Sequence, residues 1–362
     1  MARCRGVGRP SPERASLTIL LGIKTRDGAS ADLVEARRGP GIPASVSVSS
    51  AGHPGRWKGV FALTLDGPPE FAPSGNPHLT APIIALPEAG RYPGLVGGKA
   101  LALGMLASSY PVPPGFVITS PAMAALFSEE RRLADEVSAS VRHAFQRLQD
   151  ERAGPVAVRS SGTDEDGAAL SFAGQYETIL GVTDEAGLFV ALRRCWASFF
   201  GERARLYAAQ HGNRVRGGFA VLVQSLVAAE AAGVAFSLDP VTGVGDEVFI
   251  TASWGLGQTV VDGLVIPDTF RVHKRNGWIR RELGDKDMAL VCRDGVTEER
   301  PVAPENRHRY CLDDPQVRAV ADLVCRLEAH FGGGVDVEFA VADGRLHLLQ
   351  VRPITGSDAS PS

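Results

Sequence analysis

The segment 335-VDVEFAVADGRLHLLQVRP-353 predicts a β-hairpin, because two runs of alternating polar and apolar residues flank an Asp-Gly dipeptide at 343–344. A two-residue turn would place Glu338 opposite Leu349 and would mix polar and apolar side chains on both faces. A three-residue loop, with the glycine at positive φ, would instead place Glu338 opposite Gln350. We favour the longer loop because it separates the polar side chains from the apolar ones.

This register gathers four polar side chains on one face of the hairpin. The polar set is Asp336, Glu338, Gln350 and Arg352, and the apolar set on the other face is Val337, Phe339, Leu349 and Val351. One interpretation is an exposed face whose cross-strand ion pairs each contribute roughly 0.2–1 kcal/mol. The other is an oxygen site for Mg²⁺ with an arginine beside it for phosphate. A glutamine suits an oxygen site better than an ion-pair ladder, which favours the second interpretation.

A second polar stretch, 158-VRSSGTDEDGAALSFAGQYET-178, begins at the end of a short run that predicts a buried strand. The strand end would hold Arg159, whose planar guanidinium is suited to phosphate oxygens. The glycine in Ser-Phe-Ala-Gly-Gln lets backbone N–H groups approach an anion closely. The alternative is a flexible surface loop, although loops between rigid elements often carry function. The acidic run at 164–166 has no assigned chemistry.

Lys99 follows two glycines and opens a predicted helix, which suggests a phosphate-binding loop. That motif requires Gly at position 93 and Ser or Thr at position 100, where this chain has Pro93 and Ala100. A lysine near a helix start is unfavourable against the helix dipole unless an anion lies there too. Lys99 is therefore either a solvated lysine or a phosphate ligand outside the loop motif.

The order of the remaining signals predicts an α+β protein of two lobes that meet near residue 220. Helices are expected at 96–108, 121–150, 184–210 and 313–333, and strands at 111–119, 155–161, 219–227, 233–240 and 247–257. Asp184 is the expected N-cap of the third helix. The fourth is expected to begin after Asp314, with Pro315 at its first position, and to end before Gly332.

The domain division follows from composition as well as pattern. Residues 1–76 are rich in Arg, Pro, Gly and Ser, which predicts a poorly ordered or mis-assigned extension with short strands at 17–23 and 60–65. The two lobes are expected at 77–218 and 219–357, with a tail at 358–362.

Charge, hydropathy and cysteine usage exclude several classes of function. The net charge of the 362 residues is −3, and their Lys and Arg are dispersed, which argues against nucleic acid as a partner. The apolar run at 17–23 is too short to span a bilayer. The five cysteines form no C-x-x-C pair, which argues against a disulfide framework or a zinc site and predicts a cytoplasmic location.

Six blocks in order resemble the ATP-binding domain of pyruvate phosphate dikinase and phosphoenolpyruvate synthase, a domain type that also serves rifampin phosphotransferase. The blocks are 96-VGGKALALG-104, 111-PVPPGFVIT-119, 158-VRSSGTDED-166 with 171-SFAGQYETILGV-182, 234-VAFSLDPVTG-243, 254-WGLGQTVVDGLVIPD-268 and 336-DVEFAVADGRLHLLQVRPIT-355. The resemblance implies an ATP-grasp fold that clamps ATP and Mg²⁺ between two lobes.

The resemblance also implies roles for single residues. By motif position the phosphate-binding and catalytic cations are Lys99, Arg159 and Arg352. The loop over the phosphates would include Gly174, Gln175 and Thr178. The base and ribose would meet Gln224, Leu226 and Glu230. The Mg²⁺ ligands would be Glu338 and Gln350.

Enzymes of this kind cleave ATP to AMP and phosphate and pass a phosphoryl group through a histidine on a swivelling domain. No segment with such a histidine follows the hairpin, and residues 1–76 match nothing in the family's pattern. We therefore expect the acceptor to be a histidine on a separate chain, or a small molecule. A non-catalytic ATP-binding module is the alternative, and a ligase on the same fold is a third. The presence of every cation, metal and loop position favours the phosphotransferase.

Overall fold

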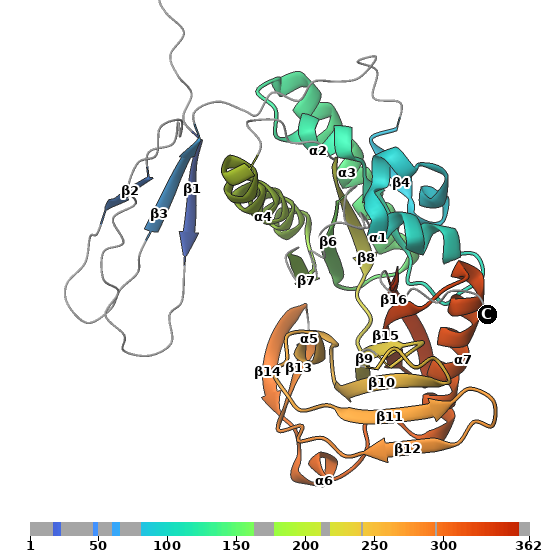
Figure 1. Ribbon diagram of the computed structural model, residues 1–362. Coiled ribbons are helices and arrows are strands. Elements are labelled where there is room, and N and C mark those ends of the chain that lie inside the picture. Colours follow the sequence, from blue (N-terminus) through green and yellow to red (C-terminus); the bar gives the residue numbers. More distant parts are fainter. Residues whose placement is uncertain are drawn as a thin grey trace, which may run out of the picture. The chain divides into compact units, whose positions relative to one another are not determined.

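The computed structural model describes residues 81–162, 177–210, 218–239, 242–293 and 295–354, together with the backbone of three strands nearer the N-terminus (Figure 1). Contacts divide the chain into two units, Met1–Asn76 with Ala204–Val215 and Pro77–Arg203 with Arg216–Ser362. In the first unit a three-stranded antiparallel sheet has the order β1 (Leu17–Gly22), β3 (Val60–Leu65) and β2 (Val46–Ser49). The strands expected at 17–23 and 60–65 are present, and the predicted lack of order in the extension stays a prediction.

The second unit contains a five-stranded antiparallel sheet. Its order is β4 (Ile83–Ala85), β5 (Gly115–Ile118), β8 (Phe219–Ser225), β6 (Val156–Gly162) and β7 (Thr178–Val182). The associated helices are η1 (Leu86–Arg91), α1 (Pro93–Leu106), α2 (Ser120–Leu126), α3 (Arg131–Glu151) and α4 (Glu185–Gln210). The single helix expected over 121–150 is wrong, since α2 and α3 are separate helices.

Alternation along the strands decides which helices cover which face of this sheet. Val158 and Val221 point toward α2, α3 and α4 and pack in one apolar cluster. Val117 and Leu222 point to the opposite face and pack against α1. Because both faces are covered, every residue of the central strands β6 and β8 is buried.

A six-stranded antiparallel sheet forms the other half of the unit. Its order is β12 (Ile279–Glu282), β11 (Asp268–His273), β10 (Glu247–Trp254), β9 (Ala231–Phe236), β15 (Val335–Ala342) and β16 (Arg345–Pro353). Beside it lie α5 (Gln258–Val261), α6 (Pro304–Arg307), α7 (Asp314–Phe331) and the hairpin of β13 (Met288–Arg293) with β14 (Val296–Pro301). Figure 1 shows α7 running along this sheet, where its apolar stripe packs against one face.

Helix ends follow capping chemistry. Asp184 accepts a hydrogen bond from the Gly187 N–H at 2.7 Å, which confirms it as the N-cap of α4. In α7 the N-cap is Asp313 rather than Asp314, because Asp313 forms a reciprocal capping box with Gln316. Gly332 ends α7 in the left-handed conformation that the sequence predicts. Among the described residues no helix is long and apolar enough to cross a bilayer.

The hairpin has the predicted pairs at its open end but not the predicted loop. Glu338 lies opposite Gln350 and Asp336 opposite Arg352, as expected. The turn, however, has two residues, Asp343 and Gly344, with φ of 50° and 67°, the positive pair of a type I′ turn.

The extra residue is instead a bulge at Leu349 in β16. Beyond it Phe339 pairs with Leu348, so Leu348 and not Leu349 lies in the core with Val337 and Val351. The sequence pattern located the pairs correctly because it constrains register. It could not locate the bulge, because an insertion at the turn and one in the strand give the same pairs below it.

The change from one sheet to the other follows β8. This strand pairs with β5 and β6, and the chain enters the second sheet at β9 after a linker at 226–230. The expected division placed residue 219 onward in the second lobe. We propose instead that the first lobe extends to Ser225.

Lys286 and Asp268 form a fully buried ion pair at 2.5 Å. Asp268 also accepts from the N–H groups of Gly284 and Cys311, so the pair joins three segments of the chain. Removing one partner of such a pair leaves an uncompensated buried charge.

We predict that Lys286→Met lowers the free energy of unfolding by about 3–5 kcal/mol, because the Asp268 carboxylate is left without its counter-ion. Arg281→Met is the control, because Arg281 pairs with Asp314 near the surface, where a pair contributes about 0–1 kcal/mol. Urea denaturation of both variants is the measurement. Equal losses in the two variants would contradict the prediction.

Candidate functional site

Strand pairing places the predicted metal ligands and their neighbours on one face of the six-stranded sheet. Residues that pair directly in an antiparallel sheet project to the same side. One row is therefore Arg352, Asp336, Phe236, Phe249 and Arg271, and the next is Gln350, Glu338, Val234, Thr251 and Thr269. This face is the one opposite α7, whose apolar stripe packs against the alternate residues.

Arg159 reaches this face from the other sheet. It lies on β6 and is 7% exposed. Its Nη2 donates to Glu338 Oε2 at 2.8 Å and to Gln350 Oε1 at 2.9 Å, and its Nη1 donates to the Leu349 carbonyl at 2.5 Å. The structure thus brings together three predicted site residues that lie on different sheets.

The bulge explains why Leu349 has a carbonyl available. A bulged residue leaves the hydrogen-bond ladder, and bulges are common where a strand must redirect a group next to a site. Here the Leu349 carbonyl turns to Arg159 and supplies its third acceptor. The sequence analysis assigned Leu349 to the apolar face and missed this role, which no residue-type signal could reveal because the group belongs to the backbone.

Lys99 lies beside Arg159. It is 8% exposed, and its Nζ donates to the carbonyl of Ser160, the next residue after Arg159, at 3.0 Å. The interpretation of Lys99 as a solvated lysine is therefore wrong. Two predicted phosphate cations thus come from α1 and β6. The Ser160 carbonyl accepts from Lys99, and two hairpin side chains and one hairpin carbonyl accept from Arg159.

Thr178 pairs directly with Arg159 at the start of β7. Glu177, which precedes it, accepts from the Ser160 N–H at 3.4 Å through its carbonyl. The other two loop residues of the sequence analysis, Gly174 and Gln175, lie outside the described residues, as does the acidic run at 164–166.

Asp336 is a carboxyl group on this face whose surroundings raise its pKa. Its Oδ1 is buried and has no hydrogen-bond partner among the described residues. Burial, followed by the negative charge of Glu338, raises the pKa of Asp336 to about 6, and Arg352 opposes the rise. Carboxyl groups with a strongly shifted pKa are frequent in functional sites.

Among the described residues, no contact joins the residues predicted to bind the base to Arg159, Glu338 or Gln350. Gln224 is buried and donates to the Pro113 carbonyl at 3.0 Å. Glu230 is exposed, and its backbone bonds to Val341 and Gly255. Leu226 lines a cavity of about 550 Å³ at the linker, together with Ser225, whose buried hydroxyl lacks a partner among the described residues.

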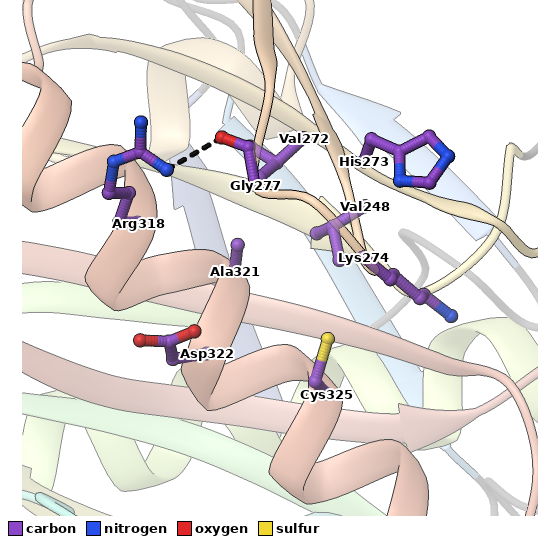
Figure 2. Close-up of a pocket in the computed structure, with 9 residues that line it drawn as sticks. All are labelled: Val248, Val272, His273, Lys274, Gly277, Arg318, Ala321, Asp322 and Cys325. Atoms are coloured by element: carbon purple, nitrogen blue, oxygen red, sulfur yellow. Dashed lines mark hydrogen bonds between the residues drawn. The ribbon is translucent and has the colours of Figure 1, made fainter.

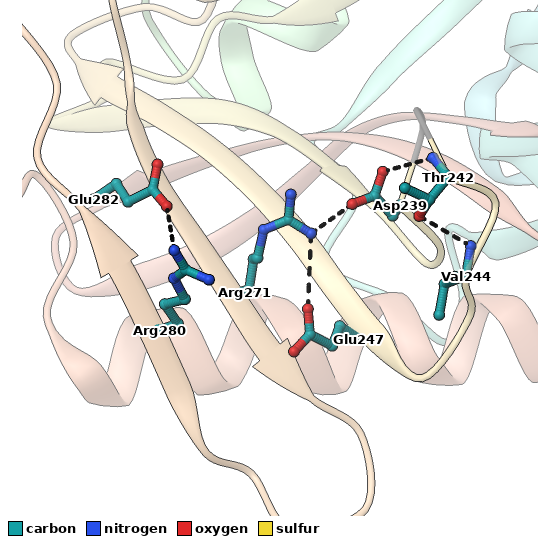
Figure 3. A network of polar contacts seen from close by, with 7 residues as sticks. All are labelled: Asp239, Thr242, Val244, Glu247, Arg271, Arg280 and Glu282. Atoms are coloured by element: carbon teal, nitrogen blue, oxygen red, sulfur yellow. Dashed lines mark hydrogen bonds and ion pairs between the residues drawn. The ribbon is translucent and has the colours of Figure 1, made fainter.

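Figure 3 shows a polar network farther along the same sheet face. Arg271 donates to Asp239 at 2.5 Å, lies 3.7 Å from Glu247, and stacks over the Phe249 ring at 4.8 Å. The hydrogen bond to Asp239 is the main cause of the raised pKa of Arg271. This arginine is held by carboxylates, and the sequence analysis did not single it out.

A smaller cavity of about 110 Å³ lies on the opposite side of the sheet, against α7 (Figure 2). Val248 and Val272 line it, and they alternate with Phe249 and Arg271 on their strands. Arg318 of α7 donates to the Gly277 carbonyl at its rim at 2.6 Å. None of the predicted site residues lines this smaller cavity.

Comparison with known proteins places the chain in a family. Residues 128–362 match the family model described as pyruvate phosphate dikinase, AMP/ATP-binding domain. The uncharacterized phosphotransferase YvkC of Bacillus subtilis is 37% identical over 282 residues, which cover 73% of this chain and 34% of that protein.

Two further relatives are similar over the same share of the chain. The probable phosphoenolpyruvate synthase of Methanothermobacter thermautotrophicus is 36% identical, over 72% of this chain and 44% of that protein. Rifampicin phosphotransferase of Bacillus cereus is 33% identical, over 72% of this chain and 34% of that protein. The chain thus spans less than half the length of each of these relatives. It belongs to the pyruvate phosphate dikinase AMP/ATP-binding domain family and has the α+β, ATP-grasp fold of two lobes that its motifs predict.

Proposed function

We propose that this chain binds MgATP between its two sheets and transfers a phosphoryl group to a histidine on a partner chain or to a small molecule. The observation that supports this most is Arg159, a buried cation from one sheet placed on the carboxylate and amide oxygens of the other. The phosphotransferase and synthase names of the relatives agree with it.

In this proposal Lys99, Arg159 and Arg352 bind the phosphates. Positively charged donors fixed before the reaction stabilise the charge that spreads over a transferring phosphoryl group. Burial of Lys99 and Arg159 strengthens such contacts, because little water screens them. Arg352 lies across the strand pair from Asp336, at the end of the same face.

The oxygen atoms of the hairpin fit Mg²⁺. Glu338 supplies a carboxylate and Gln350 an amide oxygen, which are the ligand types that Mg²⁺ prefers. The buried Asp336 Oδ1, which has no hydrogen-bond partner among the described residues, is a third oxygen on the same face, and a nearby cation would offset its burial. When bound, Mg²⁺ neutralises phosphate charge and orients the phosphates. Glu338 and Gln350 are the residues that we propose hold it.

Arg159 then has two partners in turn. Without nucleotide its guanidinium neutralises Glu338 and satisfies Gln350. Phosphate oxygens are stronger, more highly charged acceptors for Arg159. When the guanidinium donates to them instead, the oxygens of Glu338 and Gln350 become free to bind a metal ion. The site is thus kept assembled before the substrate arrives.

The remaining predicted residues complete the proposed nucleotide site. Thr178, directly opposite Arg159, would lie at the end of a loop containing Gly174 and Gln175 that covers the phosphates. Gln224, Leu226 and Glu230 would surround the base and ribose along the linker. The proposal requires no nucleophile from this chain.

ATP turnover separates this proposal from a non-catalytic ATP-binding module. Isothermal titration with MgATP, followed by an assay of AMP and ADP release with a candidate histidine-domain partner, is the experiment. Binding with release above background, abolished by EDTA, supports the phosphotransferase. Binding without release would instead support the module, and absence of binding would contradict both.

We predict that Arg159→Ala and Glu338→Ala abolish turnover and weaken MgATP binding by roughly 1.5–3 kcal/mol, the size of a lost charged hydrogen bond. Glu282→Ala is the control, because Glu282 lies in the same row of the sheet as Glu338 but is exposed at its far edge. Near-native activity of either site variant would show that the site assignment is wrong.

We also predict that Asp336 lowers stability at neutral pH in the absence of metal and nucleotide. Its folded-state pKa of about 6 lies above the ordinary aspartate pKa of 3.8, so the folded protein holds the proton more tightly. The group costs nothing below about pH 4, and the cost grows until the pH exceeds about 6.

Asp336→Asn should therefore be more stable than the wild type by about 2–3 kcal/mol at pH 7.5 and equal to it near pH 4. Urea denaturation between these pH values in EDTA is the measurement, with the exposed Asp322→Asn as control for the substitution. A difference that does not change with pH would contradict the prediction.

A further inference from the structure

The helix that carries Lys99 is broken at Gly97. This residue has φ of 70° and ψ of 162° inside α1, so helical geometry stops there and resumes at residue 98. A Cβ at this position would lie 2.1 Å from the Ser161 carbonyl oxygen, and positive φ is itself costly for other residues. Glycine is therefore required both by the backbone conformation and by the close approach of β6.

The hydroxyl of Ser161 fills the break. It accepts from the Ala100 N–H at 3.2 Å and donates to the Val96 carbonyl at 2.9 Å. In an unbroken helix Ala100 would donate directly to Val96, because the two are four residues apart. The serine side chain is thus inserted into this one helical hydrogen bond, a known cause of kinks.

The same hydroxyl also acts as a helix cap. Gly97 occupies the N-cap position of the resumed helix, where a side-chain oxygen normally accepts from the third residue, here Ala100. Glycine has no side chain, and Ser161 supplies that oxygen from β6, 61 residues away. Ser161 is fully buried, so both backbone groups depend on it rather than on water.

This arrangement connects the two cations of the proposed phosphate site. Lys99 is the second residue of the resumed helix and donates to the Ser160 carbonyl. Arg159 precedes Ser160 on the same strand. We propose that Ser161 is a positioning residue, whose hydroxyl fixes Lys99 against Arg159 for phosphate binding; this rests on the proposed function.

Loss of the hydroxyl displaces Lys99 in either of two ways. If the kink persists, the Val96 carbonyl and the Ala100 N–H are buried without partners, which is unfavourable. If the helix closes its own bond, the first turn rotates and Lys99 leaves the Ser160 carbonyl. Both outcomes weaken a contact to phosphate and leave contacts to the base unchanged.

The test compares Ser161→Ala with Ser160→Ala in isothermal titrations with MgATP and with adenosine. Ser160 is a matched control, because it is equally buried, its hydroxyl bonds only at 3.4 Å to the Glu177 carbonyl, and alanine keeps the carbonyl that Lys99 uses. Ser161→Ala should lose about tenfold in ATP affinity, the scale of a charged hydrogen bond. Its adenosine affinity and both affinities of Ser160→Ala should match the wild type.

A double-mutant cycle with Lys99→Met separates positioning from a merely structural role. If Ser161 acts through Lys99, Ser161→Ala causes no further loss of ATP affinity in the Lys99→Met background. The same tenfold loss in both backgrounds would overturn the proposal. If Ser161→Ala does not fold, Ser161→Cys replaces it, because a thiol is a weaker donor and acceptor, and unchanged ATP binding by that variant overturns the proposal too.

The wild-type titration distinguishes a failure of the proposed function from a failure of the positioning role of Ser161. A wild type that binds no MgATP contradicts the proposed function. A wild type that binds MgATP no more tightly than Ser161→Ala contradicts only the positioning role of Ser161.

Discussion

The contact of the Arg159 guanidinium with the β15–β16 hairpin is the interaction on which the site depends. A buried arginine is strongly unfavourable unless its charge and its N–H groups are satisfied. Glu338 provides the charge, and Gln350 and the Leu349 carbonyl provide further acceptors. These partners lie on a different sheet, so the site exists only if both sheets are held in register. Helix α1 contributes to this, because it contacts both β6 and β16 and packs in one apolar core with β16.

The site is assembled in advance at some cost in stability. Lys99 of α1 and Arg159 of β6 are both buried. Asp336 has a raised pKa, and its Oδ1 has no hydrogen-bond partner among the described residues. Such strain is common where a protein must receive charge from a ligand. In the proposed function the charges of phosphate and Mg²⁺ complete an arrangement that is unbalanced without them. The irregular features, the kink at Gly97 and the bulge at Leu349, both lie next to these groups.

Much of the fold and of the candidate site was predictable, because it follows from residue types and their spacing along the chain. Alternation in the hairpin predicted the pairing of Glu338 with Gln350, and the six motif blocks predicted the family and its two-lobed fold. Asp184 and Gly332 marked helix ends through local capping rules. Strands β12 to β14 escaped prediction, because their residues are mostly exposed or partly exposed and carry little periodicity.

What the sequence by itself determined was therefore which side chains share a face and which family the chain joins, since register and motifs follow from local pattern. Only the tertiary structure decided where the extra hairpin residue lies, because a bulge at Leu349 and a longer turn give the same pairs. It also decided the partners of backbone groups. The Leu349 carbonyl on Arg159 and the Ser161 hydroxyl in the broken bond of α1 arise from packing between distant segments, and no local signal encodes such contacts.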